Sequence, residues 1–163
     1  MKRLTTIIFV LIFTMTCFTA FAAAPTEPAS ITKARDAMVD AAVKQIKEIE
    51  VADVISMMKN KESFVLLDIR EAAEQGFIIP GNTKKIPRGL VEWLVGKQVK
   101  LNETVVVYCK TGLRGAFTTK VLNDLGYSKA VNLKGGIVAW LEAGYPVETY
   151  IGNIKPDGYK FAK

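Results

Sequence analysis

The sequence contains no histidine among its 163 residues. This absence excludes Ser-His-Asp and Cys-His catalysis, in which an imidazole moves the proton. It also excludes metal sites that depend on imidazole ligands, and we expect no metal site in this chain. Any reactive group must therefore be activated by something other than a neighbouring histidine.

Cysteine is nearly as scarce, since Cys17 and Cys109 are the only two. They form no Cys-x-x-Cys pair, which excludes a thioredoxin-like dithiol. If Cys17 is removed with an N-terminal leader, Cys109 is the only thiol of the mature protein and cannot form an intramolecular disulfide. In an oxidising compartment it would persist as a thiol, a persulfide or a mixed species. An unpaired thiol in an exported protein is itself an indication of function.

Residues 1–22 have the pattern of a secretory signal peptide. Two basic residues precede an apolar run (4–21), and small residues at Ala20 and Ala22 suit cleavage. The pattern predicts export to the periplasm. The alternative is an uncleaved anchor that holds the protein on the membrane, facing the periplasm, because the run approaches the length that spans a bilayer. Several threonines and the alanine-rich end favour cleavage.

The charge is mildly basic, with 22 Lys and Arg against 16 Asp and Glu. Removal of Lys2 and Arg3 with the leader would lower the formal net charge of +6 further. The lysines are scattered, so they indicate a solvated surface that mildly favours anionic ligands, and no nucleic-acid partner is expected. The remaining length allows one domain with one hydrophobic core.

The most informative stretch is residues 104–125, TVVVYCKTGLRGAFTTKVLNDL. Its β-branched run at residues 105–107 is typical of a buried parallel strand. A helical period begins at Gly115 and ends at Gly126. The pattern therefore places Cys109 in a short loop between the end of a strand and the start of a helix.

This position changes the chemistry of the thiol. The loop amides and the unbonded N–H groups of the first helical turn converge there, at the positive end of the helix dipole. Lys110 and Arg114 add full positive charges. We therefore predict that Cys109 is a nucleophile near neutral pH. Position alone is equally compatible with a buried structural cysteine, but Lys, Thr, Gly and Arg in the loop favour the reactive thiol.

The rest of the chain alternates between helical and strand patterns. Residues 31–48 predict an amphipathic helix, with Met38 on its apolar side, that either packs on its own domain or forms a dimer contact. The alternation predicts an α/β domain, a doubly wound parallel sheet flanked by helices. The elements expected after the first helix are an edge strand at 50–51, a helix at 52–59, a strand at 64–67, helical turns at 90–95 that pack Leu90, Trp93 and Leu94, a strand at 130–133, a sharp turn at Gly135-Gly136 and a helix at 137–143 with Trp140 in the core.

Four motifs in order resemble the rhodanese sulfurtransferase family. They are DIRE at residues 68–71, IPRG at 86–89, VVVYCKTGLRG at 105–115 and AVNLKGGIVAWLEAGYPV at 130–147. The resemblance implies one rhodanese-like domain at 49–148. A linker and N-terminal helix at 23–48 would precede it, and a surface tail at 149–163 would follow it.

The resemblance also assigns residues to the site. Cys109 would carry the sulfur, and five loop residues would bind the substrate: Lys110, Thr111, Gly112, Leu113 and Arg114. Asp68 would support the loop through hydrogen bonds, while Arg70 and Arg88 would add positive charge to the pocket. Residues 76–82 depart from the family pattern, with Phe77 where typical members have histidine, which leaves the path of that loop open.

The reaction implied is a two-step transfer of sulfane sulfur through a Cys109 persulfide, from a small anionic donor such as thiosulfate or polysulfide to a thiol or cyanide. No cofactor is expected. The chain also resembles bacterial periplasmic polysulfide-sulfur transferases, in which arginines matching Arg70, Arg88 and Arg114 face the sulfur chain. This resemblance leaves open a carrier that delivers sulfur to a partner protein, and it leaves open a homodimer.

Two further alternatives share the fold. Phosphatases and arsenate reductases of this fold place five residues between the cysteine and the arginine. Only four separate Cys109 from Arg114, and the smaller loop favours sulfur chemistry. Inactive rhodanese-like modules usually lack the cysteine, which is present here.

Overall fold

The computed structural model describes residues 27–160, so the predicted signal peptide at 1–22 lies outside the described residues. The chain forms two units, residues 1–33 and 34–163. Helix α2 (Ala29–Val43) begins in the described part of the first unit. There the Thr32 hydroxyl donates a hydrogen bond to the Glu27 carboxylate. Within residues 27–160 no helix is long and apolar enough to cross a membrane.

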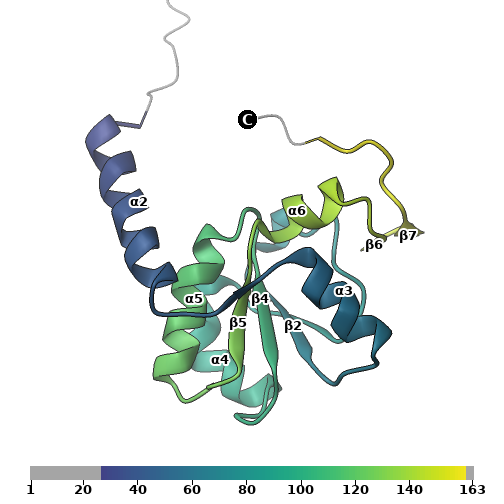
Figure 1. The fold of residues 1–163 in the computed structure, drawn as a ribbon, viewed down its shortest axis with the longest axis horizontal. Helices are drawn as coiled ribbons and strands as arrows, with labels where there is room; N and C mark the ends of the chain where they lie inside the picture. The colour runs from purple at the N-terminus through teal and green to yellow at the C-terminus, as the bar shows by residue number, and fades with distance from the viewer. Residues whose placement is uncertain (1–26, 161–163) are drawn as a thin grey trace, which may run out of the picture. The chain divides into compact units, whose positions relative to one another are not determined.

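A five-stranded sheet organises the second unit, and all of its strand pairs are parallel. The three central strands are buried at every position, as their continuous apolar runs require of strands covered on both faces. This arrangement, visible in Figure 1, confirms the predicted doubly wound parallel sheet. In order along the sheet the strands are β1 (Glu48–Ile49), β5 (Ala130–Leu133), β4 (Val105–Tyr108), β2 (Val65–Asp68) and β3 (Thr83–Lys85).

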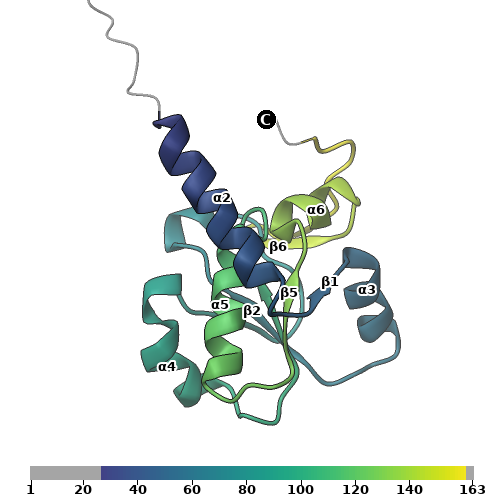
Figure 2. The same cartoon turned by 60° about the vertical axis from the view of Figure 1, so that its left-hand side comes forward.

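Helices cover both faces of this sheet (Figure 2). Because strand residues alternate between the faces, Tyr108 belongs to the core cluster of the first face and Cys109 to that of the second. The thiol therefore lies at the boundary between the core and the C-terminal edge of the sheet. The helices are α3 (Val51–Lys59) and α6 (Gly136–Glu142) on the first face, and α4 (Val91–Gln98) and α5 (Leu113–Asp124) on the second.

The edge strand differs from its prediction by two residues. It is Glu48–Ile49, not 50–51. Glu50 instead caps α3, where its backbone N–H donates to Asp53 Oδ2 at 2.9 Å in a capping box. Because a capping residue leaves the strand to satisfy the helix terminus, the sheet ends one residue before it.

Helix α2 is shorter than predicted and turns a different side inward. It ends at Val43 rather than at residue 48. Val39 and Ala42, three residues apart, are its buried side chains, whereas Met38 is 62% exposed. Met38 therefore does not pack on its own domain, and the prediction of a dimer contact is not tested by this exposure.

The region before α4 also corrects the sequence analysis. A 3-10 turn, η2 (Arg88–Leu90), leads into the helix. Trp93 was expected to pack inward but is 72% exposed, and Leu90 is half-exposed. The helix buries Val91 and Val95, one turn apart, which places residue 93 on the opposite side.

The C-terminal segment is structured rather than a featureless surface tail. Strands β6 (Val147–Thr149) and β7 (Gly152–Ile154) form an antiparallel hairpin. Ile78 and Glu148 exchange two backbone hydrogen bonds, of 3.0 and 2.9 Å, so the hairpin anchors the 76–79 loop. Tyr159 then packs against the core cluster of the α3 and α6 face.

Candidate functional site

Cys109 directly follows β4, and its side chain is buried. Helix α5 begins at Leu113, two residues earlier than predicted, with Gly112 as its N-cap residue. Gly112 has a φ of +88°, a left-handed conformation that favours glycine. The loop between strand and helix is therefore tighter than the sequence pattern indicated.

The loop forms a cradle for the sulfur. The Gly112 N–H donates a hydrogen bond to Cys109 Sγ at 3.2 Å. The carbonyls of Cys109 and Lys110 accept hydrogen bonds from the Ile137 and Val138 amides, at 2.9 and 3.1 Å. These two carbonyls are thereby satisfied at the start of α6, and an amide rather than a carbonyl contacts the thiol.

The Gly135-Gly136 turn lets the start of α6 approach the loop closely enough to form these two hydrogen bonds. Both glycines have positive φ, +75° and +57°. A Cβ on Gly136 would lie 2.5 Å from the Cys109 carbonyl oxygen and 2.7 Å from that of Lys110. The predicted sharp turn is confirmed, and its physical reason is the direct approach of two backbones.

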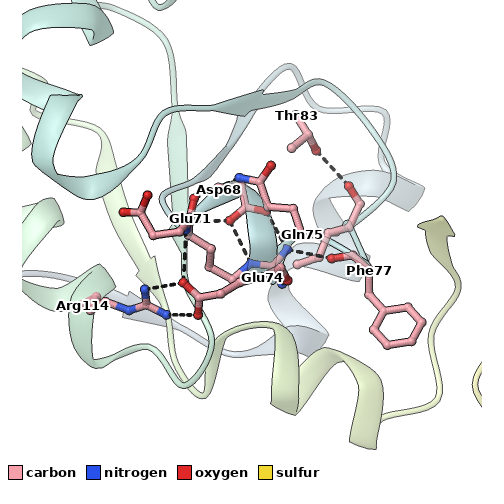
Figure 3. Close-up of polar contacts among 9 residues, drawn as sticks. Asp68, Glu71, Glu74, Gln75, Phe77, Thr83 and Arg114 are labelled. Carbon is pink, nitrogen blue, oxygen red and sulfur yellow. Dashed lines mark hydrogen bonds and ion pairs between the residues drawn. The ribbon is translucent and has the colours of Figure 1, made fainter. Parts of the chain in front are cut away.

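Arg114 is held by a carboxylate that the sequence analysis did not identify. Its Nη1 and Nη2 donate to the two carboxylate oxygens of Glu74 at 2.8 and 2.6 Å (Figure 3). Glu74 lies in a 3-10 turn, η1 (Ala72–Glu74), 40 residues before its partner. The hydrogen bond from Arg114 lowers the pKa of Glu74 to about 2. The pKa of Arg114 is raised above its usual value, mainly by its hydrogen bond to Glu74 and also by the neighbouring Cys109.

Asp68 and Arg70 form a second pair, and this one is buried. Arg70 Nε and Nη2 donate to the two Asp68 oxygens at 2.9 and 2.6 Å. Arg70 also donates to the carbonyls of Glu74 and Phe77, at 2.7 and 2.6 Å, and lies 5.5 Å from the centre of the Tyr108 ring. Burial alone would lower the pKa of Arg70, but Asp68 raises it above its usual value.

This geometry bears on the roles expected of Asp68 and Arg70. Asp68 was expected to support the reactive loop, but both of its oxygens bind Arg70. Arg70 was expected to add positive charge to the pocket, and it does line the cavity beside the loop. Its guanidinium is matched by Asp68 and fixes the 74–77 segment through two carbonyls.

The remaining predicted residues surround the loop at its surface. Lys110 and Thr111 are exposed, and Leu113 is 45% exposed. Arg88 is exposed and lies 5.7 Å from the centre of the Phe117 ring of α5. The structure thus places Arg88 beside α5, while the other two predicted cations are paired with carboxylates.

A cavity of about 230 Å³ lies beside the loop. It combines apolar walls with three charged side chains, and one wall is Tyr159 from the C-terminal segment. Nothing in the sequence pattern of that segment indicated this role. Among residues 27–160 no cluster of three or more potential metal ligands occurs. The cavity is lined by Arg70, Glu74, Phe77, Lys110, Ile137, Val138, Leu141 and Tyr159.

The chain is similar to several known proteins. The chain is 31% identical to a sulfurtransferase of Allochromatium vinosum over 69% of its own length and 99% of the relative's. A solved structure from Rhodopseudomonas palustris, of unknown function and described as a possible tyrosine phosphatase, is similar with a TM-score of 0.63 and 31% identity. The similarity covers 77% of this chain and all of that one.

The polysulfide-sulfur transferase homodimer of Wolinella succinogenes is similar to the same degree. Its TM-score is 0.63 at 29% identity, covering 72% of this chain and 88% of that one. Residues 50–143, more than half of the chain, match the family described as the rhodanese-like domain. This span contains β2, β4, the reactive loop and both glycines that bring α6 to it. The chain therefore belongs to the rhodanese-like domain family.

Proposed function

We propose that this protein is a sulfurtransferase that moves sulfane sulfur through a Cys109 persulfide. The observation that carries the proposal is the cradle itself, in which the Gly112 N–H contacts Cys109 Sγ at 3.2 Å. The sulfurtransferase relative, which is matched over 99% of its own length, supports the same activity. No histidine is needed, because backbone amides rather than a base would stabilise the thiolate.

The proposed reaction has two displacements. The Cys109 thiolate attacks the outer sulfur of the donor, the donor's S–S bond breaks, and sulfite or a shorter polysulfide leaves with the bonding electron pair. The terminal sulfur of the new persulfide carries the negative charge, which the loop amides stabilise as an oxyanion hole would. A thiolate or cyanide then attacks that sulfur, and the Cys109 thiolate is released.

The donor proposed is thiosulfate or polysulfide, a small anion in either case. Arg70 and Arg114 are paired with carboxylates, so the loop amides would share the donor charge with the Arg114 guanidinium. Similarity to the Wolinella polysulfide-sulfur transferase favours polysulfide. A carrier that passes the persulfide sulfur to a partner protein is the alternative, and it would load quickly but discharge slowly to cyanide.

Phosphatase activity is the second candidate, because one similar structure is described as a possible tyrosine phosphatase. Phosphatases of this fold are expected to place five residues between cysteine and arginine. Here four residues separate Cys109 from Arg114. The shorter loop favours a sulfur atom over a tetrahedral phosphate.

Intact mass spectrometry tests the proposal. The purified protein is measured before and after incubation with thiosulfate or polysulfide, and again after cyanide. We expect a gain of one or more sulfur masses on Cys109 that cyanide removes, and no gain in Cys109→Ser. No gain with either donor would contradict the proposal and make a phosphate-ester assay the next measurement.

We further propose export to the periplasm with removal of residues 1–22, and homodimer formation in solution. N-terminal sequencing of protein from a periplasmic extract tests the first, and light scattering of the purified protein tests the second. Recovery only in the membrane fraction with residue 1 intact would replace export with the anchored alternative. A monomeric mass at all concentrations would contradict the dimer.

A further inference from the structure

Asn132 connects the reactive loop to the edge strand of the sheet. It is almost completely buried on β5. Its Nδ2 donates one hydrogen bond to the Gly112 carbonyl at 3.2 Å and another to Glu48 Oε1 at 2.7 Å. Glu48 is its register partner on β1. One buried amide thus joins the edge of the sheet to the loop that carries Cys109.

Gly112 is the loop residue whose orientation most needs such a contact. Glycine can adopt many backbone conformations, so contacts must hold Gly112 in its left-handed one. Its carbonyl accepts from the Ala116 N–H at 2.9 Å, the first hydrogen bond of α5. The bond from Asn132 restrains the same carbonyl from the side of the sheet. Together the two bonds fix the residue whose N–H contacts Cys109 Sγ.

Gly115 of α5 packs directly against this amide. A Cβ on Gly115 would lie 2.2 Å from Asn132 Oδ1. That oxygen is buried and has no hydrogen-bond partner within residues 27–160. An unpaired buried oxygen costs stability, and a leucine of similar shape would avoid that cost. The asparagine is therefore explained by the two bonds of its Nδ2 group rather than by packing.

We infer that Asn132 is a positioning residue that holds Gly112 against Cys109, and that Glu48 orients Asn132. A carboxylate acceptor polarises the amide and fixes its direction. Glu48 precedes the span that matches the family, so a strand outside that span is connected to the loop through Asn132. The inference rests on the proposed function in that it takes Cys109 as the reacting thiol.

Asn132→Leu is the variant that tests this inference. Leucine keeps the shape and removes both bonds. The measurement is the pH profile of Cys109 alkylation by iodoacetamide, followed on the Cys109 peptide by mass spectrometry. We expect the profile to move to higher pH by about half a unit or more, with about threefold slower alkylation at neutral pH. Arg114 and Glu74, the charged pair beside the thiol, are unchanged in this variant.

The matched control is Lys134→Met. It breaks the exposed Lys134–Glu50 ion pair, which joins the residues that directly follow the same two strands. We expect its profile to coincide with that of the wild type. Alkylation needs no sulfur donor. An unshifted alkylation profile would therefore contradict only the role of Asn132, whereas failure of sulfur loading would contradict only the proposed function.

An unshifted profile in folded Asn132→Leu overturns the inference. If that variant does not fold, Glu48→Ala carries the test, because it removes only the bond that orients Asn132. A smaller shift in the same direction would then support the inference. A profile in Glu48→Ala that matches the wild type would overturn it.

Discussion

The Arg114 guanidinium holds the Glu74 carboxylate through two hydrogen bonds, although 40 positions separate the residues in the chain (Figure 3). The pair ties the first turn of α5 to η1. Each side chain is about one-third exposed, so solvent reaches the pair and weakens it. Its role is therefore to orient Arg114 beside Cys109 more than to stabilise the fold.

This pair makes stability depend on pH in a defined window. The pKa of Glu74 falls from its usual 4.5 to about 2 in the folded protein. A lowered carboxyl pKa contributes stability above the unfolded pKa, and this is lost as the pH falls from about 4.5 towards 2. We expect Glu74→Gln to be less stable at pH 7, by at most about 1 kcal/mol, and to converge with the wild type near pH 2.

Urea unfolding at pH 7, 4 and 3 measures that difference. Glu92→Gln, at an exposed position of α4, is the control and should follow the wild type at each pH. A constant gap between Glu74→Gln and the wild type across the series would show that ionisation of Glu74 is not the cause.

Arg114 and Arg88 should differ in their effect on catalysis. Arg114→Ala removes the cation beside Cys109, and we expect kcat/KM for the sulfur donor to fall by about tenfold or more with little change in Tm. Arg88→Ala removes only a contact with the Phe117 ring, and a small change is expected. Steady-state kinetics with thiosulfate and polysulfide compare the two. Equal losses would mean that the donor contacts both arginines.

The buried pair of Asp68 and Arg70 should matter for folding. Asp68→Asn leaves the Arg70 charge buried without its counter-ion, and breaking such a pair typically costs about 3–5 kcal/mol. Lys134→Met, which breaks an exposed pair, should change the unfolding midpoint little. Urea denaturation of the soluble variants gives the comparison. A loss of sulfur transfer in Asp68→Asn without loss of stability would instead assign Asp68 to the reaction.

The Arg114–Glu74 pair marks the limit of sequence analysis for this chain. The strand, loop and helix around Cys109 could be predicted because their signals are local, a β-branched run followed by a helical period. Glu74 could not, because nothing near it in sequence indicates a partner 40 positions away. Arg70 lines the cavity, and its partners Asp68, Glu74 and Phe77 lie within seven positions of it. They could not be predicted because they depend on the path of an irregular loop, which has no periodic pattern.

Substitution of Gly136 tests how closely α6 must approach the loop. Gly136→Ala would place a Cβ against the Cys109 carbonyl, at a φ of +57° that alanine adopts only with strain. We expect a loss of more than about 1 kcal/mol in stability and slower persulfide formation. Gly76→Ala, where no atom lies within 4 Å of the new Cβ, is the control. Normal persulfide formation in Gly136→Ala would mean that the loop keeps its geometry without this approach.

Tyr159 brings the C-terminal segment to the cavity beside the loop. If the cavity receives the carbon skeleton of an organic thiol acceptor, its apolar walls contribute to binding that acceptor but not to binding cyanide. We expect Tyr159→Ala to raise KM for an apolar thiol by about threefold or more and to leave KM for cyanide unchanged.

Tyr150→Ala, at the exposed tip of the neighbouring hairpin, is the matched control for this change. It alters the same segment without touching the cavity, so both acceptors should behave as in the wild type. Equal increases in KM for thiol and cyanide in Tyr159→Ala would show that the ring supports the fold. Unchanged values for both would place the acceptor elsewhere, on the exposed side of the loop near Thr111 and Leu113. The ratio of the two KM changes therefore decides where the second substrate binds.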